Sequence, residues 1–156
     1  MKVTIHPLGL ESMPPGLNTD QELIRRLEES FGRLTERAGE LADRFYGRLF
    51  KAYPDLKKLF PEDMSGQKKK LTAALSLVVA NLRTPDQVRG TLRELGQRHV
   101  GYGTKTEHYE MVCQCLVAAM AEVAGPGWSK ELASDWLTAL RMVSRIMLDG
   151  AAAVKQ

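Results

Sequence analysis

Cysteine is scarce in this sequence of 156 residues, which contains only Cys113 and Cys115. On a helix, side chains two residues apart point to nearly opposite sides, so these thiols cannot form a disulfide with each other or share a metal ion. A long apolar run is also missing, because the longest candidate for a membrane span, residues 73–82, is short and contains Ser76 and Asn81. The start of the chain lacks the apolar core and cleavage site of a signal peptide. Together with the free thiols, these absences predict a cytoplasmic protein without a membrane segment.

A strong excess of one charge is lacking as well. The 22 Lys and Arg residues exceed the 19 Asp and Glu residues by a net charge of only +3. This excess is compatible with a small acidic ligand, but it is too weak to indicate a nucleic-acid partner. The sequence contains no G-x-S-x-G nucleophile motif, no phosphate-binding loop and no H-E-x-x-H zinc motif, which excludes the enzyme classes that depend on them.

Helical periodicity runs almost without interruption from Thr19 onward, and no window shows the period-2 alternation of a strand. We therefore predict one all-α domain over residues 19–156 with about seven helices, preceded by a flexible leader over residues 1–18. The expected helices cover residues 19–31, 35–52, 54–60 as a short turn, 67–82 and 85–101, followed by one marked by Tyr109 to Val123 and one marked by Leu132 to Met147.

Two helix starts carry a capping-box pattern, in which a Thr precedes a Glu or Gln by three residues. The first is formed by Thr19 and Glu22, and the second by Thr84 and Gln87. The second pattern predicts Pro85 at the first helical position, where its missing N–H is tolerated.

His99 is the unusual residue of the helix expected over residues 85–101. It takes the fourth place of an apolar stripe that begins with Val88, Leu92 and Leu95. A cationic imidazole stabilises the C-terminal end of a helix, and this capping role is favoured from the residue alone. The alternative is a neutral imidazole directed into an apolar pocket, where it would bind a metal ion or haem iron.

Three other groups of residues have a structural interpretation, and two of them also permit a functional one. Gln67 and Leu71 share one helix face, as expected for a solvated glutamine beside a core leucine. Tyr46 flanks an apolar stripe and is either a core aromatic or a residue whose hydroxyl points into a pocket. Lys68 to Lys70 form a solvated face from which one ammonium group could reach an anion at a pocket mouth.

Taken in order along the chain, these positions resemble a globin. The matching segments are Arg44-Phe-Tyr-Gly-Arg-Leu-Phe50, the Pro-x-Leu-x-x-x-Phe turn within Tyr53 to Phe60, the Gln-x-x-x-Leu of Gln67 to Leu71, the Leu95-Gly-Gln-Arg-His99 segment, Glu107-His-Tyr109 and Trp136. The resemblance is to the bacterial branch that holds flavohaemoglobin haem domains and single-domain haemoglobins and, more distantly, to neuroglobin. It covers residues 22–148.

The resemblance implies a globin fold around haem b and a role for each matching residue. His99 would be the proximal iron ligand, with Tyr109 supporting it. Phe60 would pack on the porphyrin, Gln67 and Leu71 would line the distal side, and Tyr46 would donate a hydrogen bond to a bound ligand. Lys70, Leu95 and Tyr102 would complete the cofactor contacts.

The resemblance also implies a function, the binding of oxygen, nitric oxide or carbon monoxide. Nitric oxide dioxygenation is the expected activity, with oxygen binding, transport, storage or sensing as the alternative. A helical regulatory or DNA-binding module without a cofactor is a third interpretation and predicts a colourless protein. The sequence lacks the concentrated basic stripe and compact recognition helix that this third interpretation requires.

Two departures from the flavohaemoglobin pattern bear on these expectations. No flavin and nicotinamide reductase follows the matching region before Gln156, so the electron donor is expected to be a separate, unidentified reductase. Flavohaemoglobins also carry a glutamate that joins the proximal Tyr–His pair. Ungapped alignment from Trp136 places Ala151 there, with Asp149 nearby.

Overall fold

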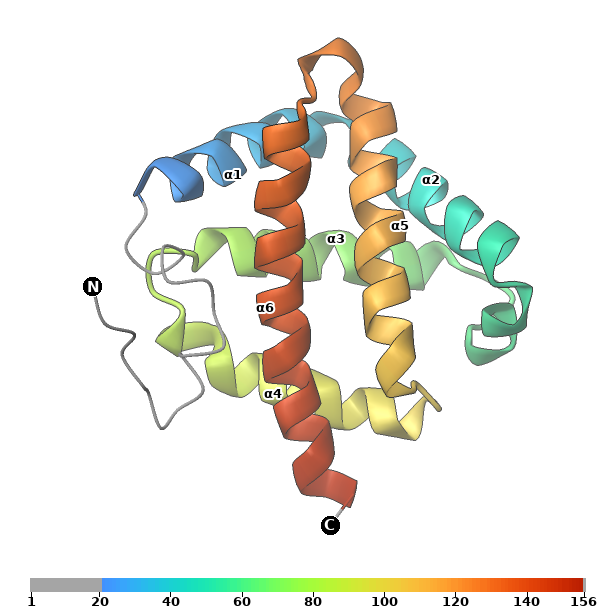
Figure 1. Ribbon diagram of the computed structural model, residues 1–156. Coiled ribbons are helices and arrows are strands. Elements are labelled where there is room, and N and C mark those ends of the chain that lie inside the picture. The colour runs from blue at the N-terminus through green and yellow to red at the C-terminus, as the bar shows by residue number, and fades with distance from the viewer. Residues whose placement is uncertain (1–20, 156) are drawn as a thin grey trace.

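The computed structural model describes residues 21–155, so the leader predicted over residues 1–18 lies outside the described part. Within residues 21–155 the chain forms six α-helices, three short 3-10 helices and no strand (Figure 1). The elements are α1 (Gln21–Leu34), η2 (Thr35–Arg37), α2 (Ala38–Ala52), η3 (Pro54–Leu59), α3 (Ser65–Ala80), α4 (Asp86–Gly101), α5 (Thr106–Ala124), η4 (Gly125–Gly127) and α6 (Lys130–Lys155). The prediction of an all-α domain with about seven helices is confirmed, with η3 as the short turn expected at Pro54.

The start of α4 differs from the prediction. Pro85 is the N-cap residue rather than the first helical residue, and no side chain caps the helix. The Thr84 hydroxyl lies 3.5 Å from Asn81 Oδ1, and the Gln87 N–H donates to the Thr84 carbonyl over 3.0 Å. The predicted capping box of Thr84 and Gln87 is therefore wrong, because the turn before the helix uses the same groups. The box predicted at Thr19 lies outside the described residues.

The core is built from apolar stripes on the helices, and α1 extends to Leu34, beyond the end predicted at residue 31. In α1, Ile24, Leu27 and Leu34 recur at helical spacing and are each at most 2% exposed. In Figure 1, α5 and α6 run side by side, and α3 and α4 cross them. Cys113 and Cys115 are both free, as expected, and both are buried. Among the helices of residues 21–155, none combines the length and apolar character that a membrane span requires.

Helices α4 and α6 approach each other through two glycines. A Cβ atom at Gly96 would lie 1.9 Å from the Met147 carbonyl oxygen, and one at Gly150 would lie 2.1 Å from the Arg93 carbonyl oxygen. Real Cβ atoms do not come this close to backbone, so only glycine permits this crossing at either position. The crossing fixes where α4 lies relative to α6.

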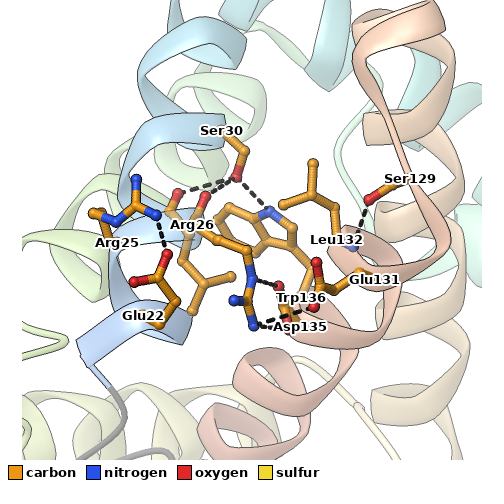
Figure 2. A network of polar contacts seen from close by, with 10 residues as sticks. Glu22, Arg25, Arg26, Ser30, Ser129, Glu131, Leu132, Asp135 and Trp136 are labelled. Carbon is orange, nitrogen blue, oxygen red and sulfur yellow. Dashed lines mark hydrogen bonds and ion pairs between the residues drawn. The ribbon is translucent and has the colours of Figure 1, made fainter.

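A polar network joins α1 to α6 (Figure 2). Arg26 Nε donates to Asp135 Oδ2 over 2.7 Å, and Arg26 Nη2 lies 3.2 Å from Asp135 Oδ1. The indole N–H of Trp136 donates to Ser30 Oγ over 3.0 Å, and the Ser30 hydroxyl donates to the Arg26 carbonyl over 2.8 Å. Trp136 is 1% exposed and Ser30 is 3% exposed, so water does not compete for these bonds.

Replacing Ser30 with Ala should lower the free energy of unfolding by about 1–3 kcal/mol, because the Trp136 indole N–H loses its buried acceptor. Urea denaturation followed by circular dichroism measures the change. Ser134→Ala, at an exposed position of α6, is the control and should shift stability by about 0.5 kcal/mol or less. Equal effects of the two substitutions would show that the indole bond does not stabilise the fold.

Candidate functional site

His99 lies in the last turn of α4 with a half-buried side chain. Its Nδ1 atom is 2.7 Å from the carbonyl oxygen of Leu95. A carbonyl can only accept a hydrogen bond, so Nδ1 carries the proton and Nε2 keeps its lone pair. Burial lowers the pKa of His99, and the nearby Arg98 cation also lowers it. The hydrogen bond to Leu95 raises this pKa but does not outweigh the effect of burial. The ring is therefore favoured as a neutral imidazole with a free Nε2, which is the form that ligates metals.

Two tyrosine rings flank the His99 ring. The Tyr102 ring centroid is 5.5 Å away, and that of Tyr109, the buried first-turn residue of α5, is 6.2 Å away. The proton on Nδ1 goes to Leu95 and not to the Tyr109 hydroxyl. The Tyr109 ring thus lies near the imidazole without a hydrogen bond to Nδ1, and Tyr102 is 52% exposed.

A second group of predicted site residues gathers around Tyr46 on α2. The Tyr46 side chain is 5% exposed, and its ring centroid lies 5.6 Å from that of Phe60. The Phe50 ring centroid lies 5.3 Å from that of Phe60, so Tyr46, Phe50 and Phe60 form an aromatic cluster. Burial raises the pKa of Tyr46, and a side-chain hydrogen bond with Gln67 of α3 opposes that rise. The phenol is therefore protonated at neutral pH and able to donate, with an amide beside it.

The remaining predicted site residues are Leu71, Leu95 and Lys70. Leu71 and Leu95 are half-buried and pack against the core. Lys70 is exposed on α3, and no ion pair holds it within residues 21–155. The turn after α4 contacts η3, because a Cβ atom at Gly103 would lie 3.3 Å from Leu59 Cδ2. Gly103 adopts a φ of +85°, which a side chain would strain.

A cavity of about 280 Å³ lies elsewhere, between α1, α2 and α3. Its lining includes Phe31, Leu34 and Leu41 together with Lys69 and Thr72, and none of the residues expected to contact haem or its ligand. These side chains do not include a histidine, a cysteine or a carboxylate. The chemistry of a metal or cofactor site therefore centres on His99, not on this cavity.

Gly96 and Gly150 are the positions that sequence reasoning missed. Gly96 precedes His99 by three residues on α4 and contacts the backbone of α6. Its only signal in the sequence is a glycine inside a helical pattern, where it costs about 1 kcal/mol relative to alanine unless packing requires it. Because the Gly96 crossing sets the position of α4, it also sets the position of the imidazole.

The charges near His99 differ from those expected for a flavohaemoglobin-like site. Ala151 is buried in α6, and Asp149 is exposed. Among residues 21–155, the charged group that acts on the pKa of His99 is the Arg98 cation, and no carboxylate does so. The His99 imidazole therefore has no anionic partner in the described part of the chain.

The sequence model of the Globin family matches residues 43–147, from α2 to α6. The match covers more than half of the chain. The chain belongs to the globin family. The resemblance stated from the ordered motifs is thereby confirmed, and the helices around His99 and Tyr46 are those of a globin.

Known relatives of this globin agree with the assignment. A flavohemoprotein of Rhizobium meliloti (strain 1021) is 29% identical over 106 residues, which cover 66% of this chain and 26% of that protein. The match thus spans about a quarter of that relative. Among solved structures, a bacterial globin from Campylobacter jejuni has a TM-score of 0.78 at 22% identity, covering 86% of this chain and 98% of that chain.

A second solved structure is an engineered carbene transferase from Rhodothermus marinus whose name includes "putative nitric oxide dioxygenase". Its TM-score is 0.79 at 24% identity, and the alignment covers 86% of this chain and 94% of that chain. At these identities the two structures establish the shared globin fold.

Proposed function

We propose that this globin holds haem b through His99 and binds diatomic gases, with nitric oxide dioxygenation as its activity. The observation that carries the proposal is the Nδ1–H to Leu95 hydrogen bond of 2.7 Å, which leaves Nε2 of a neutral imidazole free to ligate iron. The flavohemoprotein relative and the Rhodothermus neighbour support the choice of activity by the names they carry.

The residues present fit a haem. A flat, largely apolar cofactor needs one nitrogen donor on one side and apolar or aromatic surface around it. His99 supplies the donor, and Phe60, Leu71 and Leu95 supply partly buried apolar surface that packs against the core. Lys70 and Tyr102 are exposed, which suits contacts at the rim of the cofactor.

Haem iron supplies the atom that takes up a diatomic ligand and the redox change of the reaction. His99 holds the cofactor, and Tyr109 keeps the imidazole in place by ring packing. Tyr46 and Gln67 offer a phenol and an amide as hydrogen-bond donors to a ligand that carries partial negative charge. Phe50 and Phe60 exclude water from that side, which strengthens such bonds.

Nitric oxide dioxygenation converts nitric oxide, dioxygen and one electron into nitrate. We therefore propose a separate reductase as the partner that restores ferrous iron. Absorption spectra of the purified ferric and ferrous protein test haem binding, and a colourless protein would refute it. Catalytic nitrate yield with a reductase is the expected result, whereas oxygen uptake without nitrate would favour oxygen binding, transport, storage or sensing.

Tyr46→Phe should raise the oxygen dissociation rate by roughly ten- to a hundredfold. A hydrogen bond from a buried phenol to a partly charged ligand contributes about 1.5–3 kcal/mol, and about 1.4 kcal/mol corresponds to a factor of ten. Stopped-flow measurement of oxygen release gives the change. Gln67→Leu should act in the same direction, but more weakly if Tyr46 makes the shorter bond.

Carbon monoxide is the internal control for Tyr46, because its outer atom carries less negative charge and its release should change little. An unchanged oxygen rate, or an equal rise for carbon monoxide, would mean that Tyr46 only packs in the aromatic cluster.

The missing carboxylate near His99 predicts a low iron–histidine stretching frequency, below that of flavohaemoglobins. An imidazole without an anionic partner has less imidazolate character and donates less electron density to iron. We expect weak peroxidase-like activity together with the low stretching frequency. Resonance Raman spectra of the ferrous protein measure the frequency, and Asp149→Asn should leave it unchanged because Asp149 is exposed. A frequency as high as in flavohaemoglobins would mean that Asp149 or another group replaces the glutamate.

A further inference from the structure

The positive charge of this chain is concentrated on one edge, which we call the basic edge and define as residues 51–70 and 98–107. These two segments carry eight Lys and Arg residues against four Asp and Glu residues. The rest of the sequence carries fourteen against fifteen, so the whole net charge of +3 arises from the basic edge.

The fold brings the two segments together beside the candidate site. Leu59 of η3 lies against Gly103 in the turn after α4. In Figure 1 the chain that forms η3 and the C-terminal end of α4 both lie on the right of the molecule. His99 belongs to one segment, and Phe60 and Gln67 belong to the other. The basic edge therefore borders the residues proposed to hold the haem.

The cations of the basic edge are largely free of neutralising partners. Lys57, Lys105 and Arg98 are exposed and form no ion pair with any residue of 21–155. Lys58 lies 3.9 Å from Asp55, and both side chains are more than three-quarters exposed, so solvent screens this pair. Lys68 is neutralised by Asp43 at 2.8 Å.

Most arginines outside the basic edge are ion-paired: Arg25, Arg26, Arg37, Arg44, Arg48, Arg83, Arg89 and Arg141. Arg33 and Arg145 are exposed and form no ion pair with any residue of 21–155. The excess of positive charge, and the positive potential that it produces, is thus concentrated at the basic edge, because the rest of the sequence carries slightly more negative than positive charge. Such a potential steers an oppositely charged partner to the site it surrounds.

We propose that the basic edge is the docking surface for a soluble one-electron carrier whose own redox group is surrounded by acidic residues. The proposal rests on the proposed function, because nitrate formation consumes one electron, which the proposed separate reductase would deliver. Charge complementarity identifies the partner as acidic, and the position of the edge brings its redox group next to the haem site.

Titration of the ferric, haem-loaded protein with oxidised flavodoxin, an acidic one-electron carrier, tests the docking without turnover. Calorimetry at about 0.02 M and about 0.3 M ionic strength should show the affinity falling at least roughly tenfold, since the screening length shortens to less than 10 Å. The triple variant Lys57→Glu, Lys58→Glu, Lys105→Glu should lose at least roughly tenfold in affinity at low salt.

The control variant is Arg33→Glu, Lys130→Glu, Arg145→Glu, which changes the net charge equally on other exposed faces. It should lose roughly threefold or less. Equal losses in the two variants, no affinity for flavodoxin, or tighter binding of the basic edge to anionic phospholipid vesicles would overturn the proposal. A visible haem band recorded before each titration separates this outcome from failure of the proposed function, which would leave the protein without haem.

Discussion

His99→Ala is expected to abolish the histidine-type haem spectrum of this globin. The variant removes the imidazole whose Nε2 is left free by the 2.7 Å bond from Nδ1 to the Leu95 carbonyl. Within residues 21–155 the other histidine is His108, which uses its Nδ1 to accept the Lys105 backbone N–H over 3.0 Å. Among the described residues, no second imidazole is therefore available to replace His99. Ferrous and ferric absorption spectra of the purified variant measure the loss.

Two further measurements separate loss of a ligand from loss of the fold. Imidazole added in solution should restore a histidine-type spectrum in His99→Ala, because the substitution leaves space where the side chain was. His108→Ala is the matched control and should leave the spectrum nearly unchanged. A His99→Ala protein that keeps the normal five- or six-coordinate histidine spectrum would defeat the assignment of the proximal ligand.

Gly96→Ala is expected to destabilise the protein by about 3 kcal/mol or more. The added Cβ would lie 1.9 Å from the Met147 carbonyl oxygen, and backbone on both helices would have to move to admit it. For a domain of this size the midpoint of thermal unfolding should fall by roughly 6–12 °C. Haem affinity should fall with it, because α4 carries His99 one turn further along.

Gly90→Ala is the matched control on the same helix. A Cβ at Gly90 meets no atom within 4 Å, and the position is exposed. This substitution should raise stability by about 0.5–1 kcal/mol, since alanine loses less backbone entropy in a helix than glycine does. If Gly96→Ala were as stable as Gly90→Ala, α4 and α6 would not cross at the glycine contact, and the proposed positioning of His99 would be wrong.

The helices themselves could be predicted because their determinants are local. The helix marked by Tyr109 to Val123 follows from residue spacing, and the short turn at Pro54 follows from the backbone limits of proline. The start of α4 could not be predicted in the same way. Whether Thr84 caps a helix or bonds to Asn81 depends on how the preceding turn closes, and the Thr-x-x-Gln pattern is the same in both cases.

The sequence by itself determined the fold class, the family and the candidates on each helix face, since the motif from Leu95 to His99 and that from Gln67 to Leu71 can be recognised from their order along the chain. Only the tertiary structure decided how those faces meet. It placed the Tyr46 hydroxyl beside Gln67, brought η3 against the turn at Gly103, and seated α4 on α6 through Gly96. Periodicity states which residues share a face, but the approach of two faces depends on the volumes of all side chains at their crossing. At the α4–α6 crossing the decisive feature is the absence of a side chain, which leaves no trace in a hydrophobic pattern.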